Sequence, residues 1–230
     1  MEGISLEQRD QINQYILSDL GLTTEVVAEV AGANIAALAW QRWSLANQSV
    51  GVLVGSGRTG LIALIATRRL LAWGGRPTVH LGTPRDTLSR LNQAEVDRFE
   101  VLGGRVFEPG APLPAVALWI DGLFGTGFRD ELSDELKDLI DAVNHDHSPT
   151  LAIDLPSGLD ATTGKASLPA IRADVTAALG LPMVGILKPF AKQLVGEIAM
   201  IDLGIPASVW RRFGVTDTPN FDGRPFVHYS

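Results

Sequence analysis

The fold is decided by one stretch of the sequence, Val50-Gly51-Val52-Leu53-Val54-Gly55-Ser56-Gly57-Arg58-Thr59-Gly60. Its first half is a short apolar run, which is typical of a strand buried on both faces of a parallel sheet. Its second half has the spacing G-x-G-x-x-G, and the residues from Leu61 to Trp73 then predict a helix that ends at Gly74-Gly75. A buried strand, a glycine loop and a helix in this order favour an α/β fold whose first loop binds phosphate.

Strands and helices continue to alternate after this stretch. Strands are predicted at 77–81, 105–107, 116–120 and 150–154, with helices at about 83–102 and 130–143, and two later strands at 174–179 and 197–202. Such alternation predicts a mostly parallel sheet with helices on both faces. We therefore expect a Rossmann-like three-layer α/β/α sandwich with a doubly wound sheet.

Two helices are predicted before the first strand, and they form an N-terminal helical arm. Ser5-Leu6-Glu7-Gln8 is a capping box that begins a helix to about Leu20, and a second helix runs from about Thr24 to Leu45. Residues after Pro206 have no periodic pattern. We expect a single domain over residues 1–230, with the arm at about 5–46, the α/β core at about 50–206 and an irregular tail at 207–230.

The composition of the chain excludes several classes of function. The formal charge of −7 argues against a protein that binds nucleic acid. The chain has no cysteine, so disulfides, thiolate nucleophiles and Cys-ligated metals are excluded. No signal peptide is recognisable, and no apolar run approaches the roughly 20 residues of a membrane span. We expect a cytoplasmic protein that does not enter a membrane.

Ligands of such sheets bind beyond the carboxyl ends of the strands, which selects the loops at 55–60, 121–129 and 154–164. Arg58 in the first loop can contact a phosphate. The acidic residue that would bind a ribose after the second strand is absent, and Arg85 offers a cation for a 2′-phosphate instead. Asp121 and Asp154 each end a strand, and two carboxylates at one cleft can bind a hard cation or divide acid and base roles.

The second and third loops resemble segments of the N-terminal YjeF family, which includes the NAD(P)H-hydrate epimerases. Asp121-Gly122-Leu123-Phe124-Gly125-Thr126-Gly127 is similar to the family's D-A-[LIF]-[LF]-G-[TF]-G, and Ile153-Asp154-Leu155-Pro156-Ser157-Gly158-Leu159-Asp160 to its I-D-[IL]-P-S-G-[LW]-D. The resemblance runs from about Ile4 to Pro206. It implies interconversion of the R and S epimers of hydrated NADH and NADPH, which a separate S-specific dehydratase then repairs. It also implies a homodimer and a bound potassium ion, with no other cofactor.

The resemblance assigns roles to residues by their position. The potassium ligands would be Thr59, Asp121 and Ser157, and the acid/base residues at the hydrated carbon would be Asp121 and Asp154. The nucleotide contacts would be Arg58, Thr59, Gly60, Leu61, Ile62, Gly125, Thr126, Gly127, Phe128, Arg129, Asp130, Glu131 and Asp154.

The first loop departs from the family pattern. The family has N-N-G-G-D-G where this chain has Arg58-Thr59-Gly60-Leu61-Ile62-Ala63, and its P-K-x-G becomes Pro182-Met183-Val184-Gly185. Three hypotheses therefore stay open. The chain is an epimerase with altered loop chemistry, or an inactive homologue that binds a nucleotide or another protein, or a conventional NADP-binding protein that uses Arg85.

Overall fold

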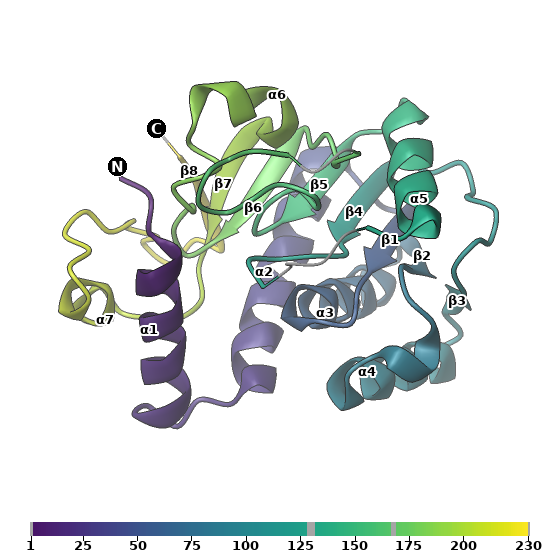
Figure 1. Cartoon of the computed structure of the whole chain (residues 1–230). Coiled ribbons are helices and arrows are strands. Elements are labelled where there is room, and N and C mark those ends of the chain that lie inside the picture. Colours follow the sequence, from purple (N-terminus) through teal and green to yellow (C-terminus); the bar gives the residue numbers. More distant parts are fainter. Residues whose placement is uncertain (1, 128–131, 167–168, 230) are drawn as a thin grey trace.

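One sheet forms the centre of the structure, a computed structural model that describes residues 2–127, 132–166 and 169–229. Within these residues the sheet has eight strands in the order β3-β2-β1-β4-β5-β6-β7-β8 (Figure 1). Neighbouring strands are parallel, except that β8 runs antiparallel to β7. The strands are β1 Ser49–Val54, β2 Arg76–Leu81, β3 Arg105–Phe107, β4 Leu118–Gly122, β5 Thr150–Ile153, β6 Val175–Leu179, β7 Glu197–Ile201 and β8 Phe226–His228.

Helices cover both faces of this sheet. The α-helices are α1 Leu6–Ser18, α2 Thr24–Trp43, α3 Arg58–Ala72, α4 Arg90–Val101, α5 Asp134–His145, α6 Lys192–Val195 and α7 Ala207–Arg212. Two 3₁₀ turns are η1 Arg85–Thr87 and η2 Pro189–Ala191. None of the described helices is both long and apolar enough to cross a membrane.

The core lies on both sides of β1, as the apolar run predicted. Val50, Val52 and Val54 pack with α2, α3 and α4 in one cluster of buried side chains. Leu53 points to the opposite face, where it packs with Trp119 of β4 and with α5. This alternation follows from the two-residue repeat of a strand. The predicted α/β/α sandwich is therefore confirmed.

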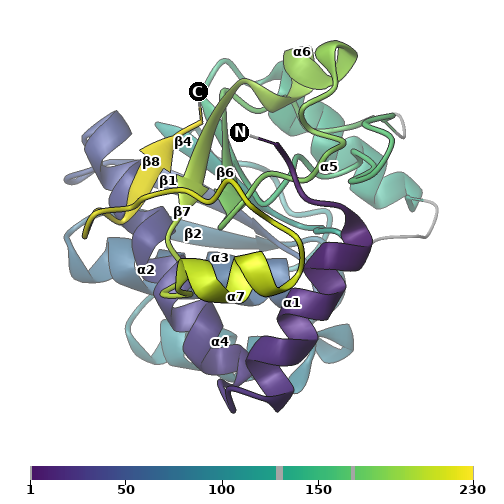
Figure 2. The same ribbon diagram turned by 90° about the vertical axis from the view of Figure 1, so that its left-hand side faces the viewer.

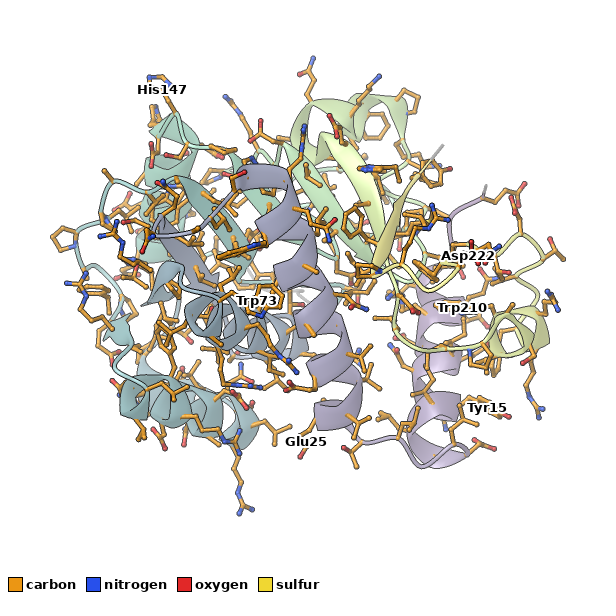
Figure 3. The ribbon with its side chains drawn as sticks, turned by 180° about the vertical axis from the view of Figure 1, so that it is seen from behind. Tyr15, Glu25, Trp73, His147, Trp210 and Asp222 are labelled. Atoms are coloured by element: carbon orange, nitrogen blue, oxygen red, sulfur yellow. The ribbon has the colours of Figure 1, made fainter. Side chains whose placement is uncertain are left out.

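The N-terminal arm is fixed to the second half of the sheet. Ser5 caps α1 through the predicted capping box. Ile4 pairs with the segment after β6, because its N–H donates to Pro182 O at 2.9 Å and its carbonyl accepts from Val184 N at 3.0 Å. Tyr15 of α1, labelled in Figure 3, packs edge to face on Phe213, which follows α7, with the two ring centroids 5.7 Å apart. Figure 2 shows α1 and α7 side by side.

Several predicted boundaries were wrong. Helix α3 begins at Arg58 and not at Leu61, so the first loop is three residues shorter than expected. The helix predicted at 83–102 is a 3₁₀ turn followed by α4, because Ser89 caps a new helix at Arg90. The tail was predicted to be irregular, but it contains α7 and β8. The start predicted at Asp130 for the next helix lies outside the described residues, and α5 is capped by Ser133.

Candidate functional site

The direction in which successive strands are added reverses at β1. This strand lies between β2 and β4, and such a reversal opens a crevice at the carboxyl ends of the strands. A cavity of about 930 Å³ lies at this end. Its wall includes α1 and α2 of the arm, the loops after β1, β2 and β4, Asp154 after β5 and the start of α5. A cavity of this volume accommodates a small-molecule ligand.

The first loop presents the start of α3 to this cavity. Gly57 is the N-cap residue and its helix has no side-chain cap, so the N–H groups of the first turn are available to an anion. Arg58 begins the helix, is exposed and lines the cavity. Gly60 allows the helix to lie against the end of β1, because a Cβ there would be 2.0 Å from Gly55 O.

Asn92 of α4 holds the first loop from behind, a role that the sequence did not reveal. Its side-chain amide donates to Gly55 O at 2.9 Å and to Gly57 O at 3.1 Å. The residue is 1% exposed. An isolated asparagine in a polar helix gives no signal of such a contact, since the contact depends on how α4 packs.

Asp121 lies behind the cavity and does not line it. Its Oδ1 accepts hydrogen bonds from Ser157 Oγ at 2.7 Å and Leu123 N at 3.2 Å, and its Oδ2 accepts from Ser157 N at 2.8 Å. Burial raises the pKa of Asp121 to about 6, although the hydrogen bonds from Ser157 and Leu123 oppose the rise. No cationic side chain of the described residues pairs with this carboxylate.

The second loop connects Thr59 to this buried cluster. Phe124 N donates to Ser157 Oγ at 3.0 Å. The next residue, Gly125, lies against Thr59, because a Cβ at Gly125 would be 2.3 Å from Thr59 Oγ1. Thr59, Asp121 and Ser157 therefore belong to one packed region, and all three supply oxygen ligands of the kind that hard cations bind. The described residues contain no cluster of three or more His, Asp or Glu side chains suited to a metal ion.

Asp154 follows β5 and its carboxylate lines the cavity. Its backbone has φ +68°, a left-handed conformation that is uncommon for a residue other than glycine and is often found at functional sites. Oδ1 is 3.4 Å from Arg9 Nη2 and 3.5 Å from Leu179 N. No described residue forms a hydrogen bond or ion pair with Oδ2. This oxygen is therefore one of the acceptors that the residues of the cavity wall offer to a ligand.

Arg9 of α1 is the second functional candidate that sequence reasoning missed. It lines the cavity, is 5% exposed and donates from Nη2 to Leu181 O at 2.8 Å. An arginine in an N-terminal helix normally lies at the surface, so its type and position gave no signal.

The structure brings part of the predicted set together. The predicted residues that line the cavity are Arg58, Thr59, Ile62, Gly125, Thr126, Gly127 and Asp154. Gly60 and Leu61 do not line it, and Leu61 faces a second hollow between α2, α3 and α4. Phe128, Arg129, Asp130 and Glu131 lie outside the described residues.

Arg85 and His147 both lie outside the cavity wall. Arg85 pairs with Glu100 at 2.6 Å and with Asp97 at 2.7 Å, and the hydrogen bonds that it donates to these two carboxylates raise its pKa. It does not line the cavity, which weakens the hypothesis of a conventional NADP site. His147 is exposed beyond α5, as Figure 3 shows, and forms no metal cluster within the described part of the chain.

Comparisons with known proteins agree with this geometry. Residues 24–185 match the family described as YjeF-related protein N-terminus. The chain is 36% identical over 187 residues to a bifunctional NAD(P)H-hydrate repair enzyme of Gloeobacter violaceus, covering 80% of this chain and 36% of that protein. It is 28% identical over 207 residues to an NAD(P)H-hydrate epimerase of Leuconostoc mesenteroides, covering 88% of this chain and 90% of the relative.

The chain thus spans well under half the length of the bifunctional relatives that it matches. A crystal structure of the yeast protein ynu0 has the same fold, with a TM-score of 0.84 over 100% of both chains and 18% identity. The family match covers most of the chain, including the loops after β1, β4 and β5. The chain therefore belongs to the family of YjeF-related protein N-termini.

Proposed function

We propose that this chain is an epimerase of hydrated NADH and NADPH, the activity for which its relative from Leuconostoc mesenteroides is named. The observation that carries the proposal is Asp154, which lines a ligand-sized cavity at the switch point of the sheet and has one carboxylate oxygen without a hydrogen-bond partner among the described residues. The start of α3 supports the proposal, because its uncapped N–H groups and Arg58 suit the phosphates of a dinucleotide.

The proposed chemistry moves a hydroxyl group between the two faces of one ring carbon. Asp154 in its protonated form donates a proton to the hydroxyl group, the C–O bond breaks, and water leaves while the electron pair of the ring nitrogen forms a C=N bond. Water then adds to the opposite face and returns the proton to Asp154. Such proton transfer contributes about 10²–10⁴-fold to a rate. The atoms balance, and neither an oxidant nor a reductant is needed.

Asp121 suits a different role in this proposal. Its carboxylate is buried behind the cavity and its oxygens accept hydrogen bonds from the protein, so it is poorly placed to reach a substrate. A potassium ion would compensate its buried charge, with Thr59, Asp121 and Ser157 as oxygen ligands. The bound ion would supply a positive charge that favours the ionised form of Asp121. Thr59, Asp121 and Ser157 also connect the loops after β1, β4 and β5 to one another through direct contacts.

The alternative is an inactive homologue that binds a nucleotide or a protein. The observation that favours it is Ile62, an apolar residue in the cavity wall where the family pattern has an aspartate. A separate dehydratase and a homodimer are further expectations of the epimerase proposal. Size-exclusion chromatography with light scattering tests the homodimer directly.

The test of the proposed function is an epimerase assay. Mixed hydrated NADPH is depleted of its S form by an S-specific dehydratase, and the protein is then added in potassium buffer. An epimerase converts the residual R form, so NADPH appears well above the spontaneous rate. A rate equal to that without the protein would refute the activity and leave the inactive homologue.

A further inference from the structure

Arg9 is a buried cation with hydrogen-bond donors that no described residue uses. A guanidinium group carries five N–H donors. In the described part of the chain only Leu181 O and the Asp154 carboxylate lie near them, both at Nη2. Nε is enclosed and has no acceptor. Because Nε is enclosed, a ligand in the cavity that Arg9 lines would bond to the terminal Nη groups, where it would add acceptors for donors that no described residue uses.

Asp154 has the complementary property. Its Oδ1 is next to Arg9, but no described residue forms a hydrogen bond or ion pair with Oδ2. The left-handed backbone at φ +68° is a conformation that the surrounding structure must impose. A guanidinium donor and a carboxylate acceptor therefore lie side by side in the wall of one cavity.

This pairing matches a hydroxyl group, which donates one hydrogen bond and accepts others. We propose that Arg9 and Asp154 together bind the hydroxyl group of the hydrated nicotinamide ring, and that Arg9 makes the cavity prefer hydrated NADPH over ordinary NADPH. The inference rests on the proposed function. One hydrogen bond joins the hydroxyl group to Asp154 Oδ2, and the hydroxyl oxygen accepts another from the guanidinium of Arg9. Ordinary NADPH has no hydroxyl group on that carbon, so neither Arg9 nor Asp154 gains this additional hydrogen bond when it binds.

A purely structural role, in which Arg9 attaches α1 to the core, does not account for its position beside Asp154. Ile4 already joins the arm to the segment around Pro182, and Gln8 Nε2 donates to Phe213 O at 3.1 Å. Neither of these residues lines the cavity. A residue needed only as a link would not have to place a cation beside Asp154, which follows β5 and lines the cavity.

The experiment compares the binding of two probes by calorimetry in the full-length protein. The probes are mixed epimers of hydrated NADPH and ordinary NADPH. The wild type is expected to prefer the hydrate by about 10- to 100-fold, the range of one hydrogen bond to a charged group. Arg9→Met is expected to lose at least tenfold of this preference. Arg9→Lys keeps the positive charge but replaces the planar guanidinium group by a single ammonium group. This variant is expected to retain part of the preference for the hydrate.

Two controls separate recognition from folding. Arg42→Met removes an exposed arginine that pairs with Glu197 at 3.3 Å away from the cavity, and its preference is expected to equal that of the wild type. Thermal melting of each variant identifies loss of fold. If Arg9→Met does not fold, Arg9→Lys decides the question, because a folded Lys variant with the full wild-type preference contradicts the inference.

The outcomes distinguish this inference from the proposed function. A protein that prefers the hydrate through Arg9 but does not catalyse epimerisation refutes the activity and supports the inference. An active epimerase whose Arg9 variants keep the wild-type preference refutes the inference alone. Equal affinity of the wild type for both probes, or no binding of either, also refutes the inference.

Discussion

Gly125 in the loop after β4 lies so close to Thr59 at the start of α3 that a larger residue at position 125 should destabilise the protein. A Cβ at Gly125 would lie 2.3 Å from Thr59 Oγ1 but 3.6 Å from Thr59 Cβ. The clash therefore comes from a single hydroxyl oxygen. Gly125 is not among the glycines with positive φ, so the alanine substitution adds no strain of that kind to the backbone.

Gly125→Ala is expected to destabilise the protein by about 1–3 kcal/mol, the usual cost of overpacking. For a chain of this length, 2 kcal/mol corresponds to a fall in Tm of about 4–8 °C. In a Thr59→Ala background the same substitution is expected to cost less than about 0.5 kcal/mol, because the clashing oxygen is gone. The two substitutions should therefore couple by about 1–3 kcal/mol.

Urea unfolding of the four proteins of this cycle gives the coupling energy. Gly127→Ala is the matched control, since a Cβ at Gly127 would have no heavy atom of the described residues within 4 Å apart from its chain neighbours, and its effect should be within about 0.5 kcal/mol. If Gly125→Ala costs the same free energy with and without the Thr59 hydroxyl, the described contact between the two loops is wrong.

Two further predictions concern buried polar groups. Burial lowers the pKa of His80 from 6.5 to about 4, so between these values the unfolded chain binds a proton that the folded chain does not. Stability is therefore lost as the pH falls, by about 2 kcal/mol between pH 7 and pH 5 from this residue. We therefore compare the free energy of unfolding in urea at pH 7 and at pH 5. In His80→Gln, the fall in this free energy between the two pH values should be smaller than in the wild type by about 2 kcal/mol. An equal fall in both proteins would exclude His80 as its source. Ser157→Ala removes an acceptor of the Phe124 N–H and a donor to Asp121, and should cost about 1–3 kcal/mol in the same assay at pH 7. A Ser157 variant as stable as the wild type would show that this network contributes nothing.

The alternation of strands and helices was predictable because it depends on local periodicity. The run from Val50 to Val54 is apolar on both faces, and the structure buries it on both faces. The start of α3 was not predictable in this way, since Gly60 is a poor helix former and suggested a loop. It is helical because the first turn of α3 packs against the end of β1. Strand β8 was missed because it is short and depends on pairing with β7.

The candidate site was predictable where a residue ends a strand. Asp121 and Asp154 occupy such positions, and sequence alone expected both to face one cleft. The structure separates them, because Asp121 belongs to β4 and is hydrogen-bonded by the loop that follows β5, whereas Asp154 lies beyond its strand. Arg9 could not be predicted, since its partners Asp154 and Leu181 are far away in sequence and meet it only after the arm has docked.

The role of Asp154 is tested most directly by the rate at which Asp154→Asn converts the R form of hydrated NADPH. Asparagine keeps the size of the side chain but cannot exchange a proton as a carboxyl group does. The account predicts a loss of about 10²–10⁴-fold in kcat with a melting temperature close to that of the wild type. A variant that folds and keeps the wild-type kcat would contradict the assignment of the site to Asp154 and its cavity.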